Sequence, residues 1–149
     1  MIRRLAVLHG VNLDRLGRRD PLIYGDFTLL ELEAGVKAFG HEAGFGEVVF
    51  FQTNHEGEMV EELHRSSEVA DCLLVNAGAW THYSYGIRDA LESSGLPFAE
   101  VHLSDVGSRE PWRQHSVFAD LPTRVTEVHG KGPDGYREAI LELAGSLEA

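Results

Sequence analysis

The sequence predicts an α/β protein in which a five-stranded parallel sheet carries helices on both faces. Short apolar runs of strand length alternate along the chain with longer segments of helical periodicity, a pattern typical of consecutive β-α-β units. The chain has 149 residues, of which 43% are hydrophobic, and this length suits one domain with a core of its own. We therefore expect residues 1–149 to form a single domain.

The predicted elements follow from the hydrophobic pattern. The strands are short, mostly apolar runs and cover residues 5–8, 48–51, 72–75, 98–103 and 124–128. The helices are longer and cover residues 28–43, 57–68, a segment around 87–91, 109–116 and 134–147. Thr28, followed three residues later by Glu31, forms the capping-box pattern that begins a helix. With right-handed crossovers, these elements favour a flavodoxin-like three-layer sandwich.

The composition excludes several classes of protein. Cys72 is the only cysteine, which excludes a disulfide framework and any metal site built from several cysteines. Because it lies inside an apolar strand, we expect a buried, unreactive thiol. The net charge of −11 argues against a nucleic-acid partner, and no apolar stretch approaches the roughly 18 residues of a membrane span. We therefore expect a cytoplasmic protein.

Polar residues follow every predicted strand, at the sheet edge where parallel folds bind ligands. These clusters are His9-Gly10-Val11-Asn12, Gln52-Thr53-Asn54-His55, Asn76-Ala77-Gly78, His102-Leu103-Ser104-Asp105 and His129-Gly130-Lys131-Gly132. Because the carboxyl ends of parallel strands meet at one edge, the pattern favours a polar pocket there over an ordinary solvated loop edge.

Two loops carry arginines. Residues 13–27 form a long connection between the first predicted strand and helix, which suggests a lid with Gly17 and Gly25 as hinges around Arg19 and Tyr24. In the second loop, Arg109 and Arg113 share one face of the predicted helix 109–116. Arginine suits carboxylate or phosphate binding, although on composition alone surface solubility is the better explanation.

Tyr24 and His102 are the candidate base and acid. Guanidinium groups favour the ionised form of a nearby phenol, so a tyrosine beside Arg19 and Arg109 suits proton abstraction. His102 follows a buried strand with Glu100 on the same strand face, where a carboxylate fixes the tautomer of an imidazole. The alternatives are loop packing for the tyrosine and a structural hydrogen bond for the histidine. Zinc-protease, dinucleotide-binding, P-loop and nucleophile-elbow motifs are absent.

Ordered motifs run along nearly the whole chain. They are His9-Gly10-Val11-Asn12-Leu13, Leu16-Gly17-Arg18-Arg19-Asp20-Pro21, Tyr24-Gly25, Asn54-His55-Glu56-Gly57, Asn76-Ala77-Gly78, Thr81-His82, Arg88-Asp89-Ala90, Glu100-Val101-His102-Leu103-Ser104, Arg109-Glu110-Pro111-Trp112-Arg113, His115-Ser116 and Gly130-Lys131-Gly132-Pro133-Asp134-Gly135-Tyr136. In content, order and spacing the chain resembles the type II 3-dehydroquinate dehydratases. The resemblance implies a flavodoxin-like fold and dehydration of 3-dehydroquinate to 3-dehydroshikimate through an enolate, without metal or cofactor.

The resemblance also implies roles for individual residues. Tyr24 would remove the proton beside the ketone, with Arg19 holding it as a phenolate and Arg109 in support. Asn12 would hold the water that stabilises the enolate. His102, oriented by Glu100, would protonate the departing hydroxyl. The implied substrate contacts are Asn76 and the backbone amides of Leu103 and Ser104 at the carboxylate, His82 and Arg113 at ring hydroxyls, and Asp89 from a neighbouring subunit. Trimers that assemble into a dodecamer are implied as well.

Some positions depart from the family pattern. They are His9, Val11, Asp20, Ala79, Asp105 and Gly107. We expect His9 and Asp105 to flank the pocket, where Asp105 would repel a carboxylate substrate. Two other functions stay open: a divergent paralogue acting on a related hydroxy-keto acid, and a non-catalytic module that binds a small anion and regulates a partner. The second is disfavoured because a binding module needs no base and acid pair.

Overall fold

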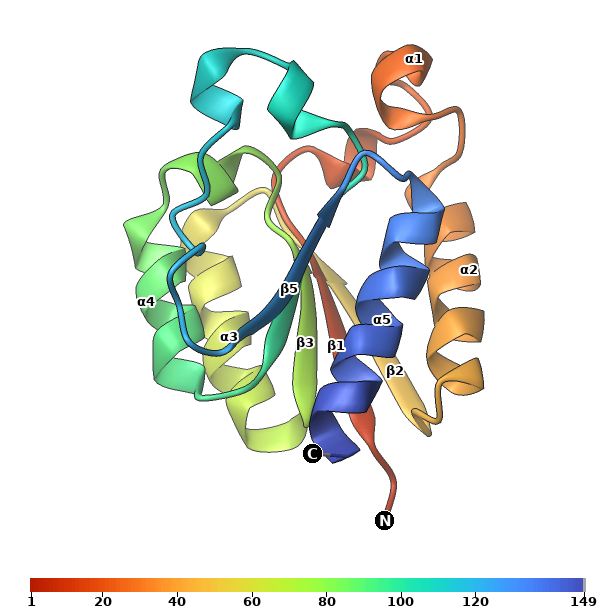
Figure 1. Cartoon of the computed structure of the whole chain (residues 1–149), viewed down its shortest axis with the longest axis vertical. Coiled ribbons are helices and arrows are strands. Elements are labelled where there is room, and N and C mark those ends of the chain that lie inside the picture. The colour runs from red at the N-terminus through yellow and green to blue at the C-terminus, as the bar shows by residue number, and fades with distance from the viewer. Residues whose placement is uncertain (149) are drawn as a thin grey trace.

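Five parallel strands form one sheet in the order β2-β1-β3-β4-β5 (Figure 1). The structure is a computed structural model that describes residues 1–148. The strands are β1 (Arg4–His9), β2 (Glu47–Gln52), β3 (Cys72–Asn76), β4 (Phe98–His102) and β5 (Arg124–His129). This is the flavodoxin-like strand order, which confirms the predicted fold class. Each strand matches its predicted range to within one residue at either end.

Four helices cover the two faces of the sheet. They are α2 (Leu29–Glu42) and α5 (Pro133–Glu148) on one face, and α3 (Glu56–Val69) and α4 (Tyr85–Ser94) on the other (Figure 1). α2 begins with the predicted capping box: Thr28 Oγ1 accepts from the Glu31 N–H at 3.2 Å, and the Glu31 carboxylate accepts from the Thr28 N–H at 3.1 Å. None of these helices has the length and apolar character needed to cross a membrane.

Two cores hold the layers together, because successive strand residues point to opposite faces. Leu5 and Val7 of β1 pack in the core beneath α2 and α5, whereas Ala6 and Leu8 pack in the core beneath α3 and α4. The predicted burial of Cys72 is confirmed: it is fully buried, and desolvation raises the pKa of its thiol to about 12.

Residues 13–27 contain local structure that the sequence pattern did not predict. Leu13–Arg15 forms a 3-10 turn, and Pro21–Tyr24 forms the short helix α1, whose first turn is capped by Asp20 Oδ1 accepting from the Leu22 N–H at 3.0 Å. Figure 1 shows α1 above the carboxyl ends of the strands, beside the segment that follows β4. Both segments therefore cover the edge where a ligand would bind.

The predicted helix over residues 109–116 is wrong. The segment holds only a 3-10 turn at Pro111–Arg113, preceded by another at Val106–Ser108. Pro111 disfavours a helical conformation at Glu110, which has φ −56° and ψ 146°. The two arginines of this segment therefore share no helical face, although both still reach the same cavity.

Candidate active site

A cavity lies at the carboxyl ends of β1, β3 and β4. Its walls are Val11, Asn12 and Leu13 after β1, Asn76, Gly78, Ala79 and His82 after β3, His102, Leu103, Ser104, Val106, Arg109 and Arg113 at and after β4, and Arg19 and Tyr24 from the 13–27 segment. The clusters that follow β2 and β5 do not line it, because these are the two edge strands. The predicted polar pocket is therefore built by three strand ends rather than five.

Two arginines surround the Tyr24 phenol. Arg109 Nη1 donates to Tyr24 Oη at 2.8 Å and lies 3.2 Å from Ser104 Oγ. The Arg19 guanidinium carbon lies 3.5 Å from the centre of the Tyr24 ring, a cation–π distance. Partial burial lowers the pKa of Arg19. This geometry concentrates positive charge around a phenol oxygen, which suits proton abstraction.

His102 places its ring on the cavity wall with one nitrogen held from behind. Its Nε2 lies 2.8 Å from Glu100 Oε2, as expected for residues two apart on a strand. The His82 ring stacks beside it with ring centres 6.3 Å apart, and His82 Nδ1–H donates to the His115 carbonyl at 2.7 Å. Burial lowers the pKa of His82 and so favours its neutral form.

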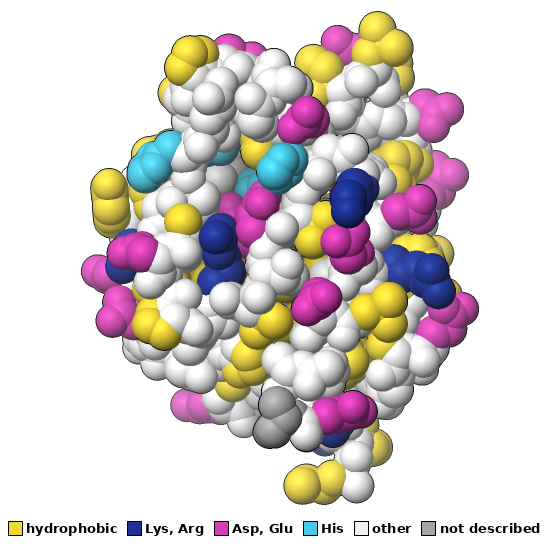
Figure 2. Space-filling view, viewed as in Figure 1, with side chains coloured by type: hydrophobic (Ala, Val, Ile, Leu, Met, Phe, Trp, Pro, Cys, Tyr) yellow, Lys and Arg dark blue, Asp and Glu magenta, His cyan; other side chains and the backbone are white. Residues whose placement is uncertain are grey.

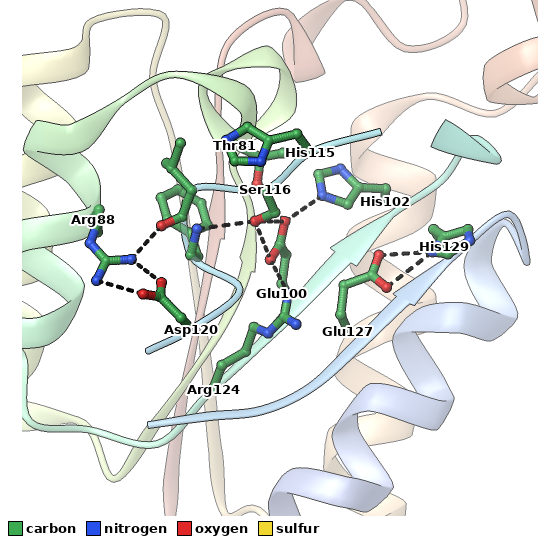
Figure 3. A network of polar contacts seen from close by, with 12 residues as sticks. Thr81, Arg88, Glu100, His102, His115, Ser116, Asp120, Arg124, Glu127 and His129 are labelled. Carbon is green, nitrogen blue, oxygen red and sulfur yellow. Dashed lines mark hydrogen bonds and ion pairs between the residues drawn. The ribbon is translucent and has the colours of Figure 1, made fainter. Parts of the chain in front are cut away.

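Glu100 is fully buried behind His102 and is surrounded by donors (Figure 3). Its carboxylate accepts hydrogen bonds from Thr81 at 2.5 Å, from Ser116 at 2.9 and 3.0 Å, and from Arg124 at 2.9 Å. Burial opposes ionisation, but the hydrogen bond and charge of His102, with the bonds from Thr81 and Arg124, lower the pKa of Glu100 to about 2. Glu100 is therefore an anion at neutral pH.

Asn12 has a left-handed backbone at the cavity wall, with φ 69°. Asn54 supports this turn, since its Oδ1 accepts from the Asn12 N–H at 2.8 Å and its Nδ2 donates to Asp14 at 3.1 Å. Gly10 permits the close approach of β1 to β3, because a Cβ there would lie 2.4 Å from the Ala77 carbonyl oxygen. The left-handed region that Asn12 occupies is sparsely populated by residues other than glycine, and residues held in it are common at functional sites.

All the site residues expected from the sequence line this cavity except two. Glu100 lies behind His102, and Asp89 on α4 does not reach the cavity of its own chain. Asn76 is oriented at the wall by two bonds: its Nδ2 donates to Tyr136 Oη at 2.9 Å, and its Oδ1 accepts from the Gly78 N–H at 3.1 Å. Within residues 1–148, no group of three or more His, Cys, Asp or Glu side chains is arranged to hold a metal ion.

The family model for dehydroquinase class II matches residues 3–144. The chain belongs to the class II dehydroquinase family. A 3-dehydroquinate dehydratase of Pelobacter propionicus is 47% identical over 149 residues, which cover 99% of this chain and 98% of that protein. The catabolic 3-dehydroquinase 1 of Aspergillus terreus is 42% identical over 144 residues, which cover 97% and 93%.

Solved structures agree with this assignment. The type II dehydroquinase from Butyrivibrio crossotus superposes with a TM-score of 0.89 at 35% identity, covering 95% of this chain and 97% of that one. The type II dehydroquinase from Propionibacterium acnes gives the same TM-score at 37% identity, with 97% and 98% covered. The chain is accordingly an enzyme of the dehydroquinase class.

In this dehydroquinase, the expectation that His9 and Asp105 flank the pocket is wrong. His9 points from β1 toward α2, is fully buried, and places Nε2 3.0 Å from Glu33 Oε2 with its ring stacked on Phe50. Asp105 is exposed and turns toward β5, where its Oδ1 lies 3.5 Å from His129 Nε2. Neither side chain lines the cavity, so Asp105 does not place its charge on the cavity wall.

The sequence pattern predicted no role for the three residues that donate to Glu100 besides His102, which are Thr81, Ser116 and Arg124. Thr81 and Ser116 fall in family-like motifs, whereas Arg124 opens the last strand and carries no motif signal. Their common feature is spatial: they come from three separate segments and meet only because β4 is paired with β5 and covered by the loops around it.

Proposed function

We propose that this chain dehydrates 3-dehydroquinate to 3-dehydroshikimate by an anti elimination through an enolate, with Tyr24 as base and His102 as acid. Family membership and the curated relatives support the reaction. One observation carries the mechanism: a phenol beside two guanidinium groups and a histidine held by a buried carboxylate line the same cavity. Shikimate biosynthesis and quinate catabolism both use this reaction, and the relatives include a catabolic enzyme.

In the first step, Tyr24 takes the proton from the carbon beside the ketone, and the electron pair of that C–H bond forms the enolate. The Arg109 hydrogen bond and the Arg19 guanidinium over the ring stabilise the negative charge on Tyr24 Oη before the transfer. Asn12, on its left-handed turn, holds the water that donates to the enolate oxygen.

In the second step, the enolate re-forms the ketone, the carbon–carbon double bond forms, and the carbon–oxygen bond of the hydroxyl breaks. His102 donates the proton that lets this group depart as water. The Glu100 carboxylate fixes the ring and compensates the charge of the imidazolium beforehand. Proton exchange with water then restores the phenolate of Tyr24 and the charged form of His102.

The other polar groups hold the substrate. Asn76 and the backbone amides of Leu103 and Ser104 bind its carboxylate, while His82 and Arg113 contact its ring hydroxyls. Support for these roles comes from their shared position on the cavity wall. The arginines that line the cavity explain how a protein of net charge −11 binds an anion.

We further propose that the chain acts as one domain whose segment 13–27 closes over the substrate as a lid. Trimers would assemble into a dodecamer in which Asp89 reaches the site of a neighbouring subunit. The place of Asp89 on α4, away from the cavity of its own chain, supports this arrangement. The proposed reaction uses neither metal nor cofactor.

The decisive experiment is Tyr24→Phe, assayed with 3-dehydroquinate by the ultraviolet absorbance of the conjugated product. Loss of the hydroxyl should lower kcat by roughly 10²–10⁴, the contribution of a positioned base, while the ring and arginines still bind ligand. Tyr85→Phe is the matched control, because Tyr85 is exposed and lies outside the cavity.

Three other outcomes would contradict the proposal. Normal turnover by Tyr24→Phe would exclude it as the base. A folded wild-type protein without turnover of 3-dehydroquinate, but active on a related hydroxy-keto acid, would indicate a divergent paralogue. Binding of small carboxylates with no turnover would indicate the regulatory module instead.

A further inference from the structure

We propose that Arg124, at the start of the edge strand β5, is a positioning residue for the Glu100–His102 pair. It holds one oxygen of the Glu100 carboxylate and sets the pH range over which His102 stays protonated. This inference rests on the proposed role of His102 as the acid.

Arg124 and His102 contact different carboxylate oxygens of Glu100 (Figure 3). Arg124 Nη1 lies 2.9 Å from Oε1, while His102 Nε2 lies 2.8 Å from Oε2. The remaining partners, Thr81 and Ser116, are neutral hydroxyl donors. Within residues 1–148, Arg124 is thus the only permanently charged group bonded to Glu100.

An irregular strand register brings Arg124 to this position. β4 and β5 pair Phe98 with Arg124 and Ala99 with Thr126, so Val125 is an extra residue in β5. Arg124 and Glu127 are three positions apart, so in a regular strand their side chains would point to opposite faces of the sheet.

With the bulge, Arg124 and Glu127 both line a second cavity that backs onto Glu100 and His102. In Figure 2, histidine side chains gather in the upper half of the view, below the two lobes at its top. The sheet therefore directs an arginine from its edge onto a fully buried carboxylate.

Other charged and titratable groups surround His102 but do not share its carboxylate. His82 follows β3, Arg113 and His115 follow β4, Glu127 and His129 lie on β5, and Arg109 lies across the active cavity beside Tyr24. Because Arg124 is held against Glu100, it counterbalances part of the negative charge that stabilises the imidazolium. Without Arg124, the full negative charge of Glu100 stabilises the His102 imidazolium.

The test replaces Arg124 with Gln and with Met and compares the pH dependence of kcat. We expect kcat to fall roughly tenfold, a fraction of the 10²–10⁴ that a positioned acid contributes, with KM changed less than about twofold. In the pH profile of kcat, the basic limb, where His102 loses its proton, should move up by about one pH unit, because a nearby positive charge has been removed. Arg124→Lys keeps the charge and should leave the limb in place.

The matched control is Arg4→Gln. Arg4 is also the first residue of its strand and is bonded to a glutamate of the adjacent strand, Glu47 at 3.1 Å, but it lies three strands away from β5 and lines neither of the two cavities. This variant should show wild-type kcat and an unmoved limb.

A second readout does not depend on turnover. The His102 ring titration, followed by NMR in labelled protein without substrate, should move in the same direction in Arg124→Gln. This titration tests the role of Arg124 even if His102 is not the acid. Whether His102 is the acid is decided separately by His102→Ala. A lower kcat with both the limb and the ring titration unmoved would make Arg124 merely structural and overturn the proposal, as would wild-type behaviour in all assays.

Discussion

The molecule contains the triplet Glu-Val-His twice, on adjacent parallel strands and in register. Glu100 pairs with Glu127, and His102 pairs with His129, across β4 and β5. Each histidine contacts the glutamate of its own strand, at 2.8 Å for His102 and 2.9 Å for His129. The motif and the contact distance are thus nearly the same in the two pairs, although His102 uses Nε2 and His129 uses Nδ1.

Their surroundings differ. The Glu100 and His102 side chains are 1% and 6% exposed, whereas those of Glu127 and His129 are 24% and 41% exposed. Glu100 has donors from three other segments, and solvent screens the pair on the edge strand. The comparison teaches that a glutamate two residues before a histidine is a common local contact. Burial, compensating donors and an adjoining cavity distinguish the pair suited to catalysis.

The largest expected effect comes from removing the buried histidine. His102→Ala should lower kcat by roughly 10²–10⁴, because the departing hydroxyl loses its proton donor. Substrate binding, measured by calorimetry, should change far less, since the other polar groups of the cavity remain. Circular dichroism checks that the variant is folded. An unchanged rate in a folded variant would remove His102 as the acid and leave the two pairs without a functional difference.

The next effect concerns stability and sharpens the contrast between the two carboxylates. The pKa of Glu100 is lowered to about 2 from an ordinary value of 4.5, so its ionised form favours the folded state. That stabilisation is fully present above about pH 4.5 and is lost as the pH falls toward about 2. At neutral pH it is on the order of 3 kcal/mol.

Urea unfolding at a series of pH values measures this contribution. Glu100→Gln should lower the free energy of unfolding at neutral pH and flatten its decline in acid. The matched control is Glu127→Gln, whose solvent-screened partner on the edge strand should leave the curve close to that of the wild type. Equal curves for the two variants would contradict the view that burial distinguishes the pairs.

Most of the fold was predictable from the sequence because both faces of the sheet are buried. β3, for example, reads as an uninterrupted apolar run from Cys72 to Val75 between two polar boundaries. The capping box at Thr28 gave the start of α2. The helix expected over residues 109–116 does not form, because the residue before Pro111 avoids the helical conformation, a local effect that the hydrophobic pattern does not contain.

The candidate site was predictable where it depends on strand ends and short spacings. Strand alternation placed His102 beside Glu100, and the end of β3 placed Asn76 at the cavity. Arg124 was not predictable, because its contact depends on a bulge in the pairing of β4 with β5. The expected effect of Asp105 on the cavity was wrong for a similar reason: its direction is set by a turn, which sequence adjacency does not reveal.

The smallest expected effect tests the exposed pair itself. His129→Ala should leave kcat and KM within about twofold of the wild type, because solvent screens the contacts of His129 with Glu127 and Asp105. Added salt should change kcat and KM of the wild type and of this variant to the same extent. The assay is the one used for His102→Ala, so the two triplets are compared directly. A loss above tenfold in a folded His129→Ala protein would show that the edge-strand pair takes part in the reaction, and burial alone would no longer separate the two.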